Sequence, residues 1–90
     1  MFSIVVACEG VPPEAAPQAA LEIVEEFKHR PWHQNVACVW DGRALVLNAV
    51  NDYDTNGLAL LDEFSDALAA CITELFDGKM YVVSATEVPE

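Results

Sequence analysis

The chain has 90 residues, 53% of them apolar, and fifteen acidic against four basic side chains give a formal net charge of −11. This length fits one domain over residues 1–90, with enough apolar side chains for a core. A chain with this negative charge is repelled by nucleic acid and by anionic membranes. The partners that remain are cations, basic proteins or a second copy of the chain. The apolar share is high for so short a monomer, which indicates that another subunit covers part of the surface.

The cysteines indicate a reducing compartment. Cys8, Cys38 and Cys71 are odd in number, lie far apart and form no C-x-x-C pair, so a disulfide framework is not expected. All three are typical of small buried hydrophobic residues. The sequence shows no signal-peptide pattern and no apolar run of about 18 residues. We therefore expect a soluble, cytoplasmic protein.

A strand followed by a helix is predicted in the first third of the chain. Residues Phe2–Cys8 are apolar and β-branched, which is typical of a buried strand. Pro17 is tolerated only in the first turn of a helix, so the helix has its N-cap no earlier than Glu14, and Pro31 ends it. At about 100° per residue, one helix face collects the apolar side chains of Ala16, Ala20, Ile23, Val24 and Phe27.

A β-hairpin is predicted in the middle of the chain. Two β-rich runs, residues 36–40 and 43–50, flank Asp41-Gly42, and Asp-Gly between such runs is a strong hairpin signal. With Asp41-Gly42 as a two-residue turn, Trp40 opposes Arg43. One face then carries Val36, Cys38, Trp40, Leu45 and Leu47, and the other carries Ala37, Val39, Ala44, Val46 and Val50. Both faces are therefore apolar.

A second helix and a last strand are predicted in the final third. The helix has an apolar stripe formed by Leu58, Leu61, Phe64, Leu68, Ile72 and Leu75, and its opposite side is acidic. Gly78 is suited to the position just after the helix. Residues Met80–Ala85 are typical of a strand.

The predicted order β-α-β-β-α-β is that of an α+β protein and resembles the ferredoxin-like, or split βαβ, arrangement. The resemblance implies a four-stranded antiparallel sheet in the order 4-1-3-2, with both helices on one face. The other sheet face would be open and largely apolar, and exposed apolar faces mark interfaces or ligand sites. We therefore expect a homodimer that pairs sheet to sheet.

One stretch, Asp52–Glu63, matches the acidic pattern D-x-D/N-x-D/N-G-x5-E and resembles an EF-hand calcium loop. The resemblance implies calcium as a cofactor, held by Asp52, Asp54, Asn56, the backbone carbonyl of Leu58, and Glu63. The segment before the loop is β-rich, so the site would be a strand-loop-helix variant of an EF-hand. Without a second loop, the site should bind calcium weakly, with a dissociation constant of about 10⁻⁴ to 10⁻³ M.

A capping turn is the alternative interpretation of the same stretch. Asp54, Thr55 or Asn56 would then cap the second helix, and Gly57 would relieve a tight turn. Glu63 would belong to the solvated acidic side of that helix. The two interpretations differ at the helix start, because a helix that begins by Leu58 uses within itself the carbonyl that calcium needs.

Other site chemistry has weak support in the sequence. His29, His33 and Cys38 are the zinc-ligand candidates, but they are only three, and Pro31 breaks the helix between the two histidines. No nucleophile–base constellation is visible around either histidine. The sequence therefore predicts neither a catalytic site nor a zinc site.

The function predicted from these features is that of a small acidic, non-enzymatic interaction or regulatory module, homodimeric, with a calcium loop over Asp52–Glu63. The alternative is a dimeric α/β-barrel-like enzyme that acts on a small apolar substrate. Such an enzyme should enclose a cavity touched by Trp32, Trp40 or a histidine. The module should instead have a packed core and a flat apolar sheet face.

Overall fold

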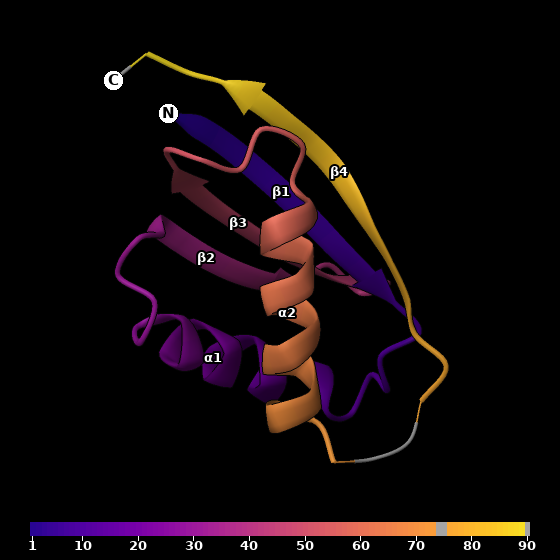
Figure 1. Ribbon diagram of the computed structural model, residues 1–90. Helices are drawn as coiled ribbons and strands as arrows, with labels where there is room; N and C mark the ends of the chain where they lie inside the picture. The colour runs from indigo at the N-terminus through magenta and orange to yellow at the C-terminus, as the bar shows by residue number, and fades with distance from the viewer. Residues whose placement is uncertain (74–75, 90) are drawn as a thin grey trace.

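The computed structural model describes residues 1–73 and 76–89 and confirms the predicted order of elements. The elements are β1 (Phe2–Glu9), α1 (Ala16–Phe27), β2 (Gln34–Trp40), β3 (Ala44–Asn51), α2 (Leu58–Cys71) and β4 (Lys79–Glu87). The strands form one antiparallel sheet in the order β2-β3-β1-β4, which is the predicted order counted from the other edge. Both helices cover one face of this sheet, and α2 crosses in front of the strands in Figure 1. The fold is therefore α+β, with a strand order compatible with the ferredoxin-like arrangement.

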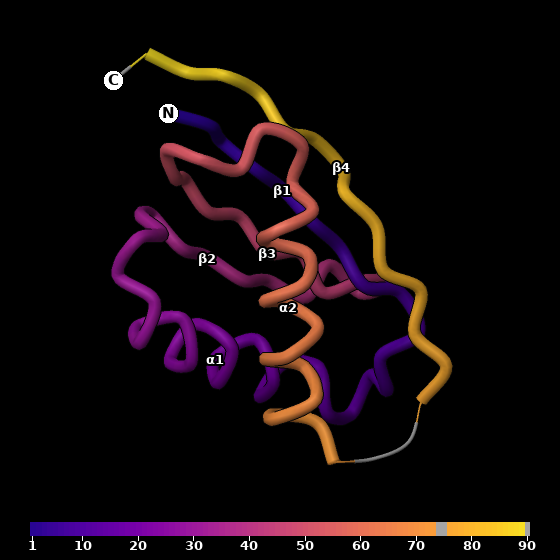
Figure 2. The backbone as a smooth tube through the Cα atoms, in the orientation of Figure 1, coloured from indigo at the N-terminus to yellow at the C-terminus, as the bar shows by residue number. Residues whose placement is uncertain are grey.

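The two ends of the described chain lie at one corner of the sheet. Figure 2 shows the first and last strands running side by side to this corner, where the Val88 N–H donates to the Met1 carbonyl at 2.9 Å. Within residues 1–73 and 76–89, neither helix has both the length and the apolar character needed to cross a membrane.

The core lies between the sheet and the two helices. Helix α1 buries Ala16, Ala19, Ala20, Ile23 and Phe27, which confirms most of its predicted apolar face. Ile4 and Val6 of β1 and Leu45 and Leu47 of β3 are fully buried beneath the helices. Packing of these apolar side chains, with two-residue alternation along the strands, fixes which sheet face the helices cover.

Helix α2 is rotated and shorter than predicted. Its buried residues are Leu60, Phe64, Ala67 and Leu68. Leu58 is 59% exposed and Leu61 is half-buried, because both border a hollow beside β4 instead of facing the sheet. The helix ends at Cys71, since Ile72 has extended backbone angles, and Leu75 of the predicted stripe lies outside the described residues.

The β2–β3 hairpin forms with a different turn from the one predicted. Trp40 opposes Leu45, so Gly42 and Arg43 are the loop residues. The Asp41 carboxylate accepts hydrogen bonds from the backbone N–H groups of Arg43 and Ala44 at 2.8 and 2.7 Å, and these donors lower the pKa of its carboxyl. Gly42 takes a positive φ of 93° that suits glycine. The pairing shifts by two residues, so every side chain stays on its predicted face.

The sheet face opposite the helices is open, as strand alternation predicts. One row of side chains crosses all four strands in register: Val39, Val46, Ala7 and Tyr81. Val39 is 55% exposed, and Val5, Val46 and Val50 are half-buried. Ala7, in the same row, is only 1% exposed. We call the surface formed by Val5, Val39, Val46, Val50 and Tyr81 the open sheet face. These side chains are apolar apart from the Tyr81 hydroxyl, and polar residues lie beside them on the same face, with Asn48 and Ser84 on either side of Val5.

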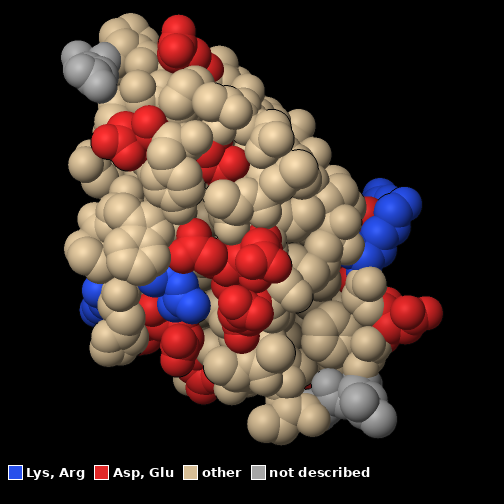
Figure 3. Space-filling view, viewed as in Figure 1, with Lys and Arg blue, Asp and Glu red and all other residues tan. Residues whose placement is uncertain are grey.

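Acidic side chains gather on the other side of the molecule. Figure 3 shows them clustered on the face where α2 lies. Asp62 and Asp66 are exposed on this helix, one turn apart. The face that carries α2 is therefore acidic.

Candidate functional site

The turn before α2 is organised by a buried carboxylate. Asp54 is 4% exposed and accepts hydrogen bonds from the backbone N–H groups of Gly57 at 3.0 Å, Ala59 at 3.4 Å and Leu60 at 2.8 Å. The first N–H groups of a helix have no partner within the helix, so this carboxylate supplies one. Gly57 has a φ of 82°, and an added Cβ would come within 2.7 Å of the Val82 side chain. Asp54 and Gly57 together fix where α2 begins.

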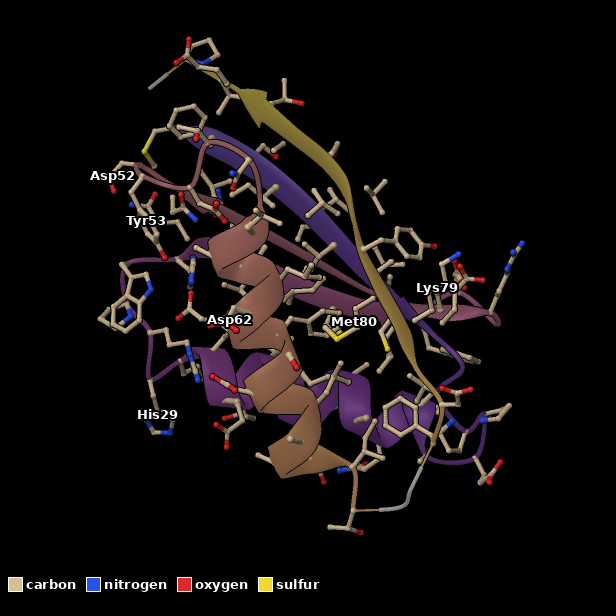
Figure 4. The ribbon with its side chains drawn as sticks, turned by 45° about the vertical axis from the view of Figure 1, so that its right-hand side comes forward. His29, Asp52, Tyr53, Asp62, Lys79 and Met80 are labelled. Atoms are coloured by element: carbon tan, nitrogen blue, oxygen red, sulfur yellow. The ribbon has the colours of Figure 1, made fainter. Side chains whose placement is uncertain are left out.

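The other predicted calcium ligands lie in different surroundings. Asp52 is exposed at the rim of the loop (Figure 4), and the Asn56 side-chain oxygen accepts from the Leu58 N–H at 3.0 Å. Helix α2 begins at Leu58, which is the arrangement the capping interpretation requires. Glu63 is turned toward the segment between α1 and β2, where its carboxylate contacts Arg30 and His33. The contacts therefore support the capping turn.

Calcium binding at this loop is a prediction from the sequence that these contacts disfavour. It would require Asp54 to release backbone donors and Glu63 to release Arg30 and His33. Over residues 1–73 and 76–89, no group of three or more His, Cys, Asp or Glu side chains is placed to hold a metal ion. The two histidines considered as zinc ligands also lie in different surroundings, because His29 is exposed (Figure 4) and His33 is buried.

We expect calcium to leave the thermal stability of the protein unchanged, because both key carboxylates already have partners. Melting should be followed by circular dichroism in about 10 mM calcium and in chelator. Ligand at a hundredfold over its dissociation constant adds about 2.7 kcal/mol to the free energy of unfolding. A calcium-dependent rise in melting temperature that Asp52→Ala abolishes would show that the loop rearranges into an EF-hand-like site.

A polar cluster surrounds His33 and joins four parts of the chain. Its members, the His33 cluster, are Arg30, His33, Asn51, Tyr53 and Glu63. Glu63 Oε2 lies 2.6 Å from His33 Nε2, and Glu63 Oε1 lies 3.2 Å from Arg30 Nε. Tyr53 donates its hydroxyl hydrogen to Glu63 at 3.4 Å, and the charge of Glu63 adds to burial in raising the Tyr53 pKa. The Glu63 carboxylate therefore contacts three side chains, those of Arg30, His33 and Tyr53.

The hydrogen bonds of Asn51 determine which ring nitrogen of His33 carries the proton. The Asn51 side-chain oxygen accepts from the backbone N–H groups of Tyr53 at 3.2 Å and Asp54 at 2.8 Å. Its amide nitrogen therefore faces His33 Nδ1, 3.3 Å away, and donates to it. Nδ1 must then accept, which leaves Nε2 to carry the proton that is donated to Glu63. The hydrogen bonds thus select one tautomer of the imidazole.

The cluster is enclosed by aromatic rings and a strand irregularity. Ring centroids of Phe27, Trp32 and Tyr53 lie 5.5, 5.9 and 6.1 Å from that of His33. Just after His33, Asn35 has a φ of 53° and the β2–β3 register shifts. Such bulges re-aim neighbouring side chains. An open hollow of about 240 Å³ lies beside the cluster, lined by Val24, Phe27, Lys28, Arg30, Pro31, His33 and Val36.

The contacts of the His33 cluster join the α1–β2 connection, β3 and α2 and engage the polar atoms of its side chains. Both ring nitrogens of His33 have hydrogen-bond partners, so neither offers a free lone pair to a metal or a substrate proton. Among the described residues, no buried side-chain nitrogen or oxygen lacks a partner. Burial raises the pKa of Cys38 to about 12, so this thiol stays protonated at neutral pH and is a poor nucleophile.

The sequence does not predict the His33 cluster. It makes His33 a candidate zinc ligand and Glu63 a candidate calcium ligand, and these two residues lie 30 positions apart. One signal was present in the sequence. Two-residue alternation places Asn51 on the same inward face as Leu45 and Leu47, and a buried amide requires a polar partner.

The EF-hand resemblance covers Asp52–Glu63 alone. Around this stretch the structure shows a capped helix start and a buried hydrogen-bond network. Comparisons of the chain with protein-family models, with curated proteins and with solved structures give no match.

Proposed function

We propose that this protein is a non-enzymatic interaction module that works as a homodimer paired through the open sheet face. The observation that carries the proposal is the row Val39, Val46, Ala7 and Tyr81, which crosses four strands on a face without helices and in which all but the buried Ala7 are exposed or half-buried. Val39, at one end of the row, is 55% exposed. Burying such a surface against another protein is favourable at about 25 cal/mol per Å² of apolar area.

The charge of the open sheet face favours a second copy as the partner. The chain carries −11, so two copies repel each other unless they meet where that charge is absent. At the edge of this face Arg43 contacts Glu9 at 3.0 Å, and Lys79 pairs with Glu9 across the strands. Two of the four basic residues of the chain therefore lie beside this face.

A twofold axis would let the open sheet face meet itself. In such a pair the same patch is buried on both subunits, so an apolar row that is balanced in charge is self-complementary. Tyr81 adds a hydrogen bond to Glu9, which lowers the pKa of the Glu9 carboxyl and keeps it charged beside Arg43. This supports a polar rim around an apolar centre, which is the usual anatomy of an interface.

The alternative, a dimeric enzyme acting on a small apolar substrate, stays a prediction. Trp40 packs against the core and Trp32 is 48% exposed. His33 touches an open hollow, but both of its ring nitrogens are engaged. These contacts favour the interaction module over the enzyme.

A charge placed on the open sheet face should dissociate the dimer. Val39→Asp should weaken self-association about thirtyfold, because a carboxylate would have to be desolvated in the interface. The control is Leu21→Asp, since Leu21 is 66% exposed on α1, away from this face. Light scattering during size-exclusion chromatography measures the mass, with 9.8 kDa for the monomer.

The expected result is a wild-type dimer, a dimeric Leu21→Asp variant and a monomeric Val39→Asp variant, all with the same circular dichroism. A monomeric wild type would contradict the proposal. Equal dissociation of the two variants would contradict it too, because the effect would then come from added charge and not from the face.

A further inference from the structure

A groove runs between α2 and β4 on the helical side of the sheet. Two hollows of about 240 and 280 Å³ share Ser65 and Met80 in their walls. We call these two hollows together the α2–β4 groove, and Leu58, Leu61, Asp62, Ser65, Leu68 and Met80 are among the residues that line it. Figure 4 shows Met80 beside α2. The proposed homodimer leaves this groove free, because Met80 and Tyr81 are neighbours on opposite faces of β4.

The groove has the dimensions and spacing of a helix-binding surface. Leu58, Leu61 and Ser65 follow one another at intervals of one helical turn along α2, and Leu68 continues the row. Leu58 is 59% exposed and Leu61 half-exposed, so these two side chains offer apolar surface to a partner, whereas Leu68 is 3% exposed and lies at the bottom of the row. The α2 residues that line the groove run from Leu58 to Leu68, which gives a groove about 15 Å long, or about three turns of a second helix.

Acidic side chains flank the groove. Asp62 lines it, and Asp66 follows one turn later on the exposed surface of α2. Figure 3 shows acidic groups gathered on this side of the molecule. Unlike Glu63, which Arg30 and His33 engage, these two carboxylates are exposed to solvent. An apolar groove beside a negative ridge is complementary to an apolar stripe flanked by Lys or Arg.

We propose that the α2–β4 groove binds a basic amphipathic helix of a partner protein. Addition of a strand to the β4 edge is less well supported, because the β1–β4 register shifts near the middle of β4 and Lys79 occupies one end. The inference names a partner class for the proposed interaction module and rests on that function. Dimerisation and helix binding use opposite sheet faces, so each can be tested while the other fails.

The probe is a synthetic Leu/Lys peptide of about 18 residues with apolar positions at i, i+3, i+4 and i+7. Its fluorescence anisotropy should show saturable binding to the full chain with a dissociation constant of about 1–100 µM. Asp62→Lys combined with Asp66→Lys should weaken binding about tenfold or more. The matched control, Glu14→Lys combined with Glu87→Lys, changes the net charge equally at exposed sites outside the groove and should have a much smaller effect.

A second pair of variants tests the apolar part of the groove. Leu58→Glu should weaken peptide binding about tenfold, whereas Leu21→Glu, at an equally exposed position on α1, should weaken it little. A peptide of the same composition with a scrambled pattern should bind far more weakly. The proposal is overturned if the two charge variants lose affinity equally, if Leu58→Glu binds like wild type, or if the scrambled peptide binds as well. Persistence of the dimer in every variant would leave the proposed function intact.

Discussion

Replacing Asp54 by alanine should lower the free energy of unfolding by about 3 kcal/mol, measured by urea denaturation in chelator. The carboxylate is buried and accepts from three backbone N–H groups at the start of α2. Alanine would leave these donors without a partner in a region closed to water. For a domain of this size, a loss of 3 kcal/mol corresponds to a fall in melting temperature of about 15 °C.

Asp52→Ala is the matched control for this loss. Asp52 is an exposed carboxylate two residues away, and its removal should change stability by no more than about 0.5 kcal/mol. Asp54→Asn keeps one acceptor oxygen and should lose about half as much stability as alanine. Equal losses for Asp52→Ala and Asp54→Ala would contradict the assignment of Asp54 as the cap of α2.

Replacing Glu63 by alanine should lower the free energy of unfolding by about 2–3 kcal/mol. Its loss leaves the His33 Nε2–H without an acceptor, and the His33 side chain is fully buried. Arg30, whose side chain is 21% exposed, loses its contact at 3.2 Å as well. Glu63→Gln retains an acceptor for His33 and should therefore recover part of the stability.

A double-mutant cycle separates the His33–Glu63 contact from general damage. The variants His33→Ala and Glu63→Ala should be coupled by about 1–2 kcal/mol, because they share a hydrogen bond of 2.6 Å. Asp62→Ala, next to Glu63 but exposed on α2, is the control and should leave stability nearly unchanged. Additive losses in the cycle would show that the two side chains act independently.

The hairpin illustrates what the sequence could predict. Alternation of apolar side chains was sufficient to assign residues to the two sheet faces, and all of those assignments hold. The predicted turn, Asp41-Gly42, lies one position too early. The Asp41 side chain accepts hydrogen bonds from the N–H groups of Arg43 and Ala44, so Gly42-Arg43 is the loop. The pairing moved by two residues, which preserves the faces, so an error in the turn did not become an error in the fold.

The site was harder to predict than the fold, because it depends on contacts between distant segments. The acidic pattern at Asp52–Glu63 specifies residue types that suit both a calcium loop and a capped helix. The contacts of Glu63 with Arg30 and His33 come from the packing of α2 over the α1–β2 connection, which no spacing rule encodes. Sequence periodicity also failed to give the rotation of α2, since Leu58 and Leu61 fit the apolar stripe but lie beside the groove.

The most direct test of the proposed homodimer is an isotope-filtered NOE experiment on a mixed sample. Labelled and unlabelled chains would be unfolded, combined and refolded, so that only contacts between subunits give signals. The proposed function predicts intermolecular NOEs that join the methyl groups of Val39 and Val46 to each other and to the Tyr81 ring. A dimer whose intermolecular NOEs arise from α2 and not from the open sheet face would contradict it.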